Sequence, residues 1–158
     1  DKEIVSTFTV FRDEFDVHLD GYLPLRSVLN LFERARSDCL GGPNQLRRLQ
    51  EQDSILFVVV AIDDLSLVHW NPATSATGTN ADATPDDQPR QRLLSAGQQV
   101  QVTTDYVVKR SGMILECQQT AWVQGSRMAQ GVVTLMALNA QTRRPTSKLP
   151  VWLQELLQ

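Results

Sequence analysis

The chain has few of the residues from which metal sites and disulfide frameworks are built. Its 158 residues contain two cysteines and two histidines. Cys39 and Cys117 lie far apart and belong to no cluster with metal-ligand spacing, so no zinc site is expected. No base stands near either cysteine in the sequence, and we predict that both are buried thiols acting as small apolar side chains. No metal and no cofactor is expected.

Long apolar runs and a surplus of positive charge are also absent. No segment approaches the roughly 20 apolar residues of a membrane helix, so no membrane contact is expected. The net charge of −3 argues against a general nucleic-acid binder. The first residues, DKEIVST, lack the basic-then-apolar layout of a signal peptide. We therefore expect a cytoplasmic protein, with a removed presequence as the alternative.

Five segments have the pattern of β-strands, and a content of 42% apolar residues suits a single domain over residues 1–158. The segments are residues 4–11, 55–70, 100–109, 113–123 and 127–138. Tight turns join the last three, which predicts antiparallel pairing. The segment 55–70 is apolar on both faces in its first half, as in a central strand under a helix. Asp63 and Asp64 interrupt it and predict a bulge or kink at an edge or interface.

Two helices are expected between the first and second strands. The longer covers residues 27–40 and ends at the breaker Gly41-Gly42-Pro43, and a short polar helix follows over residues 43–52. A stripe at helical spacing should face inward, made of Leu25, Val28, Leu29, Phe32, Ala35 and Arg36. One long helix on one face of an antiparallel sheet is an α+β design.

Residues 71–95 interrupt this regular pattern. The segment is rich in Pro, Ala, Thr and Asp and has few large apolar residues. We expect a disordered insertion between two strands. A loop that caps a substrate is the alternative, because loops of this length are often functional.

The most informative stretch is residues 16–36, DVHLDGYLPLRSVLNLFERAR. Asp16, His18 and Asp20 alternate, so in an extended backbone their side chains point to one side. They stand just ahead of a helix N-terminus, where unpaired N–H groups can bind developing negative charge. Acyl-transfer chemistry requires such an arrangement, although a solvated strand end would read the same way.

Several motifs along the chain resemble the hotdog-fold acyl thioesterases of the 4-hydroxybenzoyl-CoA thioesterase and acyl-ACP thioesterase group. They comprise the strand Phe8 to Arg12, the pair position Asp16-Val17-His18, Gly21, the block Phe32-Glu33-Arg34-Ala35-Arg36, and Gln130-Gly131 followed by VVTLMALNAQTRRPTSKLP. The resemblance spans nearly the whole chain. It implies the hotdog fold, in which a five-stranded antiparallel sheet wraps a long central helix.

The resemblance also implies an activity, the hydrolysis of acyl-CoA or acyl-ACP thioesters, and a homodimer or homotetramer with a continuous sheet. In that family the second acid of a D-x-D pair attacks the carbonyl or activates water, and N–H groups at the start of the long helix hold the oxyanion. His18 stands at the second acid position here and Asp16 at the first. Histidine can act as a base near neutral pH, whereas a shift of one residue in the match would make Asp16 the catalytic acid.

Five further residues are candidates for substrate binding. Tyr22 and the N–H groups near Leu25 would line the thioester and the oxyanion site. The basic residues Lys109, Arg110 and Arg127 are expected to cluster at strand ends, where phosphates of CoA or phosphopantetheine could pair with them.

Glu33 is the third catalytic candidate, because it stands at the glutamate of the family's F-E-x-A-R block. Surface pairing with Arg34 or Arg36 is the alternative to partial burial against a partner subunit. His69, at the end of the second strand, is expected to pack or to cap. Four apolar residues are expected in the core, where an acyl tunnel could share them: Val58, Val60, Phe32 and Leu135.

Two other functions remain open. His18-Leu19-Asp20-Gly21 with a later Val-Leu and Glu33 resembles the H-x-P-G, V-L, E pattern of hydroxyacyl dehydratases and hydratases. Asp20 replaces the proline of that pattern, and Glu33 lies one residue too far along, which favours the thioesterase. A non-catalytic hotdog protein that binds acyl or aromatic ligands is the third possibility, because position 18 lacks the aspartate.

Overall fold

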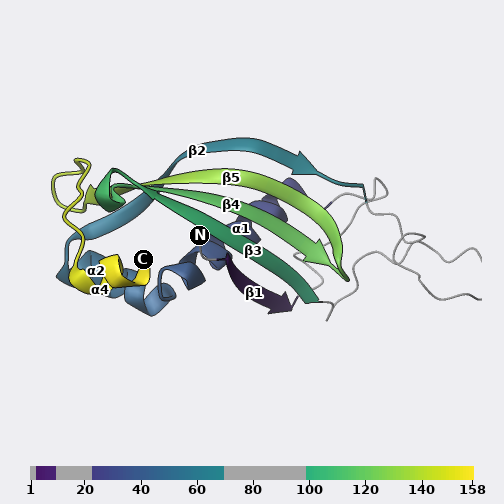
Figure 1. The fold of residues 1–158 in the computed structure, drawn as a ribbon, viewed down its shortest axis with the longest axis horizontal. Coiled ribbons are helices and arrows are strands. Elements are labelled where there is room, and N and C mark those ends of the chain that lie inside the picture. The colour runs from purple at the N-terminus through teal and green to yellow at the C-terminus, as the bar shows by residue number, and fades with distance from the viewer. Residues whose placement is uncertain (1–2, 10–22, 70–98) are drawn as a thin grey trace, which may run out of the picture.

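The computed structural model describes residues 3–9, 23–69 and 99–158, and its elements are drawn in Figure 1. The strands are β1 (Glu3–Thr9), β2 (Ile55–Leu67), β3 (Gln99–Lys109), β4 (Ile114–Val123) and β5 (Ser126–Asn139). The helices are α1 (Leu25–Cys39), α2 (Pro43–Gln52), the single 3₁₀ turn η1 (Arg110–Gly112) and α4 (Val151–Leu156). The predicted insertion at residues 71–95 lies outside the described residues.

The five strands form one antiparallel sheet in the order β1-β3-β4-β5-β2. The sheet curves around α1, while α2 and α4 lie together at one end of it (Figure 1). Short links join β3, β4 and β5, and each of these strands pairs with the next, as the tight turns predicted. The expected α+β arrangement is confirmed, together with both predicted helices.

The position of β2 differs from the expectation of a central strand. Within the described residues β2 pairs only with β5, so it forms one edge of the sheet. Val60 was expected in the core but is 48% exposed. The predicted bulge is confirmed, because the pairing register shifts between Asp63 and Ser66, and Asp64 has a positive φ. A second shift, between Val59 and Ala61, leaves Val60 out of the pairing.

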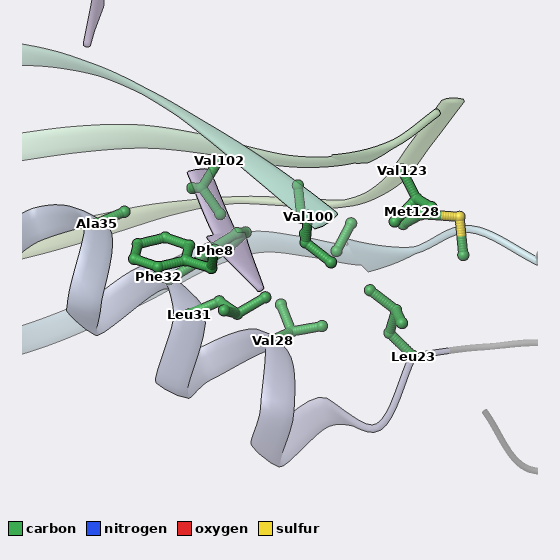
Figure 2. Packing of buried hydrophobic residues seen from close by; sticks show 12 residues of the cluster. Phe8, Leu23, Val28, Leu31, Phe32, Ala35, Val100, Val102, Val123 and Met128 are labelled. Atoms are coloured by element: carbon green, nitrogen blue, oxygen red, sulfur yellow. The ribbon is translucent and has the colours of Figure 1, made fainter. Parts of the chain in front are cut away.

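The first half of α1 packs on the sheet through large apolar side chains (Figure 2). Phe32 and Val28 are fully buried and share a cluster with Val100 and Val102 of β3 and with Met128 at the start of β5. The middle of the inward-facing stripe predicted for α1 is thus confirmed. Two residues of the predicted stripe depart from it: Leu25 opens the helix and is 47% exposed, and Leu29 is only partly buried.

A second apolar cluster fills the other end of the sheet. It joins the end of α1 to α2, β4 and β5 through Leu40, Leu49, Leu115 and Leu135. The helix α4, which the sequence pattern did not reveal, covers this cluster with Leu153. The described helices include none that is long and apolar enough to cross a membrane.

Gly112 lies where the β3–β4 turn meets the C-terminal segment. Its φ is +89°, and a Cβ there would overlap the Cδ1 atom of Leu149. Gly125 in the next turn has a φ of +77° and open space around it. Both alanine variants should have a free energy of unfolding about 1 kcal/mol lower, because alanine is strained in the left-handed backbone conformation. In Gly112→Ala the free energy of unfolding should fall by about 1–3 kcal/mol more, because the new Cβ overpacks against Leu149. Urea unfolding of the two variants measures the difference, and equal losses would show that the contact with Leu149 has no cost.

Candidate active site

The first turn of α1 lies near the end of the sheet where Val123 of β4 and Leu67 of β2 pack in the same apolar cluster as Val28. Pro24 occupies the N-cap position, and its carbonyl accepts a hydrogen bond from the N–H of Val28 at 3.1 Å. No side chain caps the helix among the described residues. The N–H groups of the first turn therefore keep the capacity to donate to a developing oxyanion.

Three of the predicted site residues, Asp16, His18 and Tyr22, fall in residues 10–22, outside the described part of the chain. Their roles stay predictions. Leu23, the first residue described after this segment, is 1% exposed and packs in the cluster beneath α1. Leu23 therefore ties this point of the chain to the beginning of the helix, two residues before Leu25.

Arg127 lies at the same end of the sheet as the first turn of α1. It follows the β4–β5 turn and is exposed, with Nη1 donating to Oε1 of Gln130 at 2.9 Å. The next residue, Met128, packs in the cluster of α1, and its carbonyl accepts a hydrogen bond from Val68 at 2.8 Å. The end of β2 consequently reaches this region too, with His69 exposed just beyond it.

Lys109 and Arg110 lie at the opposite end of the sheet, so the expected cluster of three basic residues does not form within the chain. In the register of β4, Lys109 pairs with Ile114, whereas Arg127 pairs with Trp122. Eight residues of extended strand correspond to about 26 Å. Lys109 also forms an ion pair with Glu116 at 2.6 Å. The β3–β4 and β4–β5 turns have similar sequence signals although they lie at opposite ends of β4. The prediction that the three basic residues cluster was therefore wrong.

Glu33 is exposed on α1, two turns after the start of the helix. Arg34, the neighbouring residue, places its guanidinium over the ring of Phe8 at 4.5 Å from the centroid. The guanidinium of Arg36 is directed toward β4, where its Nη1 donates to Oε1 of Gln119 at 2.9 Å. No ion pair between Glu33 and either arginine occurs among the described residues.

A buried polar network links α1 to the sheet, and sequence reasoning missed it. The amide nitrogen of Gln119 donates to the carbonyl of Phe32 and to Oγ1 of Thr104, both at 3.0 Å, while its oxygen accepts from Arg36. Gln119 and Thr104 are fully buried, and Arg36 is 9% exposed. The alternation of β4 could have found Gln119, because it falls on the inward parity between Cys117 and apolar Ala121.

Both cysteines are free and buried, as predicted. Burial raises the pKa of the Cys117 thiol to about 12, and burial also raises the pKa of Cys39. Protonated thiols are poor nucleophiles, so neither cysteine is suited to covalent catalysis. In the described part of the chain, no three His, Cys, Asp or Glu side chains gather as a metal site would require.

The comparisons with known proteins are informative only at the level of structure. No protein-family model matches the chain, and no curated protein matches its sequence. The 1,4-dihydroxy-2-naphthoyl-CoA thioesterase Slr0204 from Synechocystis matches with a TM-score of 0.68 at 10% identity, over 99% of this chain and 96% of that chain. The hypothetical protein SAV2348 from Staphylococcus aureus, solved in complex with CoA, gives 0.68 at 13% identity, over 99% and 82%.

The chain has the hotdog fold. An acyl-ACP thioesterase from Bacteroides thetaiotaomicron shares it, with a TM-score of 0.58 at 14% identity over 91% of this chain and 49% of that chain. The fold implied by the sequence motifs is thus confirmed over nearly the full length. In this hotdog fold α1 is the central helix, and its first turn, which no described side chain caps, is the candidate oxyanion site.

Proposed function

We propose that this hotdog protein hydrolyses thioesters of acyl-CoA or acyl-ACP. The observation that carries the proposal is the match of nearly the whole chain to hotdog structures that include thioesterases for a CoA ester and for acyl-ACP. Two features of the chain support it independently. The first turn of α1 offers N–H donors that no side chain of the described residues caps, and titratable residues stand a few positions before it in the sequence.

In the proposed reaction, water attacks the thioester carbonyl carbon while His18, as general base, takes its proton. Asp16 holds the imidazole or takes over the role of base. As a nucleophile, Asp16 would instead displace the thiolate and form a mixed anhydride, which water then hydrolyses to the acid and the free carboxylate. The tetrahedral oxyanion is held by N–H groups of the first turn of α1, near Leu25. The C–S bond then breaks, the sulfur leaves as a thiol with the proton carried by the base, and the acyl group leaves as a carboxylic acid.

Arg127 is the basic residue proposed to bind the acyl carrier, which is CoA or the phosphopantetheine of ACP. Tyr22 is proposed to line the thioester, and Arg127 to pair with a phosphate of CoA or phosphopantetheine, because Arg127 lies at the end of the sheet where α1 begins. Lys109 and Arg110 cannot serve that site of their own chain, because β4 separates them from it. Glu33, exposed on α1, is proposed to act from the side of the helix that a partner subunit would approach.

The assembly is proposed to be a homodimer, or a dimer of dimers, joined through β2. This edge strand exposes Val59, Val60 and Ile62 at 47%, 48% and 43%. An unprotected edge with apolar side chains favours pairing with another strand. A second copy would continue the sheet across a two-fold axis.

Replacing Val60 with lysine should shift the protein toward monomer, because the new charge would be desolvated in the β2 interface. Val5→Lys is the matched control, since Val5 is 54% exposed on β1, the other edge strand. Light scattering at micromolar concentration measures both variants. A wild-type monomer, or a dimer that survives Val60→Lys and dissociates with Val5→Lys, would overturn this assignment.

A cytoplasmic location is also proposed. Both cysteines are free, which suits a reducing compartment. Thiol titration of the protein isolated under non-reducing conditions should find both cysteines reduced, and an intermolecular disulfide would argue for an oxidising compartment.

The function is tested by offering the purified protein a panel of acyl-CoAs of different chain lengths, aryl-CoAs and acyl-ACPs, and measuring release of free thiol. A thioesterase releases thiol from some members of the panel with multiple turnovers. A dehydratase or hydratase would instead change the absorbance of enoyl or hydroxyacyl thioesters without thiol release. Binding without either reaction would identify a non-catalytic ligand-binding protein.

A further inference from the structure

A cavity of about 200 Å³ lies between the second half of α1, α2 and the beginning of β2. Much of its wall is apolar, made by Leu40, Leu49, Ile55 and Leu135, all of them buried. Arg36 lies about 16 Å along the helix from Leu25, at 1.5 Å per residue. The cavity is therefore separate from the first turn of α1, where the oxyanion would be held, although its wall includes Glu33, for which a role beside a partner subunit is proposed above.

The charge of Arg36 is the unusual part of this wall. The side chain is 9% exposed, and its one hydrogen bond within the described residues goes to the neutral amide oxygen of Gln119. Burial lowers the pKa of Arg36, which shows how little of its charge water stabilises. A guanidinium stays charged at physiological pH and carries five N–H donors, so among the described residues most of its hydrogen-bonding capacity has no partner.

Gln119 cannot supply more. Its amide nitrogen is already committed to the carbonyl of Phe32 and to Thr104, and its oxygen to Arg36. These bonds fix the amide so that it holds the guanidinium in place at the wall of the cavity. A positive charge with a fixed position and open donors is suited to bind an anion.

We propose that this cavity binds a small monocarboxylate with an apolar body, whose carboxylate pairs with Arg36. The planar guanidinium donates two parallel hydrogen bonds to a carboxylate, and the leucine wall takes the apolar body. A single negative charge fits better than a phosphate, because Arg36 is the one cation among the described residues that line the cavity, and Glu33 stands at the same wall.

Glu33 gives the proposal its sharpest variant. Burial has the largest effect on the pKa of Arg36 and lowers it. Cys117 and then the carboxylate of Glu33 raise this pKa by smaller amounts. Glu33 forms no ion pair with Arg36 among the described residues, and its carboxylate at the same wall repels an incoming carboxylate. Glu33→Gln removes this repulsion without altering the volume of the wall.

Binding is measured by calorimetric titration of the whole protein with hexanoate, with 1-hexanol as the uncharged probe of the same shape. Wild-type protein should bind hexanoate at least tenfold more tightly than hexanol, the approximate effect of a charge-assisted hydrogen bond. Arg36→Met should remove the preference, and Arg34→Met should retain it, because Arg34 stacks on Phe8 and does not line the cavity. Glu33→Gln should tighten hexanoate binding about twofold or more and leave hexanol unchanged.

Equal affinity of wild-type protein for hexanoate and hexanol would overturn the proposal, as would a preference that persists in Arg36→Met. Where Arg36→Met fails to fold, the Glu33→Gln result decides, and hexanoate binding that is unchanged or weaker rejects the site. The readout is binding of a free acid, so it is independent of thioester hydrolysis. A protein that hydrolyses no thioester could still bind hexanoate, and the reverse also holds.

Discussion

Replacing His18 with alanine is expected to lower kcat by roughly 10²-fold or more, because general-base assistance contributes about that much. KM should change little, since an imidazole that only accepts a proton from water adds little to substrate binding. The wild-type rate should rise with pH through the titration of an imidazole, because the base must be unprotonated to accept a proton. The measurement is steady-state thiol release from the best thioester of the panel, over a range of pH.

Asp16→Ala is the matched variant for this result, and His18→Asp is the restoring one. With His18 as base, Asp16→Ala should keep part of the activity, and His18→Asp should keep activity with a flatter dependence above pH 6, about where a carboxylate is already unprotonated. A protein in which His18→Ala is fully active and Asp16→Ala is dead assigns the chemistry to Asp16. Full activity in both alanine variants would place the site elsewhere.

Replacing Phe32 with alanine is expected to destabilise the protein by about 3–5 kcal/mol, the usual cost of removing a buried aromatic side chain. Phe32 is 0% exposed and packs in the cluster between α1 and the sheet (Figure 2). Its removal leaves a cavity that the neighbouring side chains, held by the β-sheet, can fill only in part. Urea unfolding monitored by tryptophan fluorescence gives the free energy of unfolding.

Phe57→Ala is the control for this prediction, because it removes the same side chain from a partly buried place on β2. Its cost should be clearly smaller, about 1–2 kcal/mol. A loss at Phe57 equal to or greater than the loss at Phe32 would mean that the β2 edge is covered in solution. That outcome would support pairing through β2 while showing that burial within one chain does not measure burial in the assembly.

Local patterns predicted most of the fold. The period-two alternation of β3 predicted a half-buried strand, and the stop at Gly41-Gly42-Pro43 marked the end of α1. The interruption at Asp63-Asp64 predicted the bulge in β2. Each of these signals depends on neighbours in sequence, where side-chain periodicity and backbone preferences act directly.

Features that depend on distant contacts could not be predicted in the same way. A strand that is apolar on both faces can lie in the centre of a sheet under a helix, or at an edge that a second subunit covers. The sequence pattern is the same in both cases, so the predicted central position of β2 was wrong. The bond between Arg36 and Gln119 joins residues 83 positions apart. The helix α4 is only six residues long and owes its stability to packing of Leu153 against the second core cluster.

Hydrolysis in water enriched in oxygen-18 tests the central claim most directly. The purified protein is given the thioester it turns over fastest, and the released acid is analysed by mass spectrometry while free thiol is counted. The account predicts one thiol and one acid per thioester consumed, with one oxygen of the acid taken from the labelled water after a multiple-turnover reaction. A protein that binds these thioesters but releases no thiol, across acyl-CoA, aryl-CoA and acyl-ACP substrates, would contradict it.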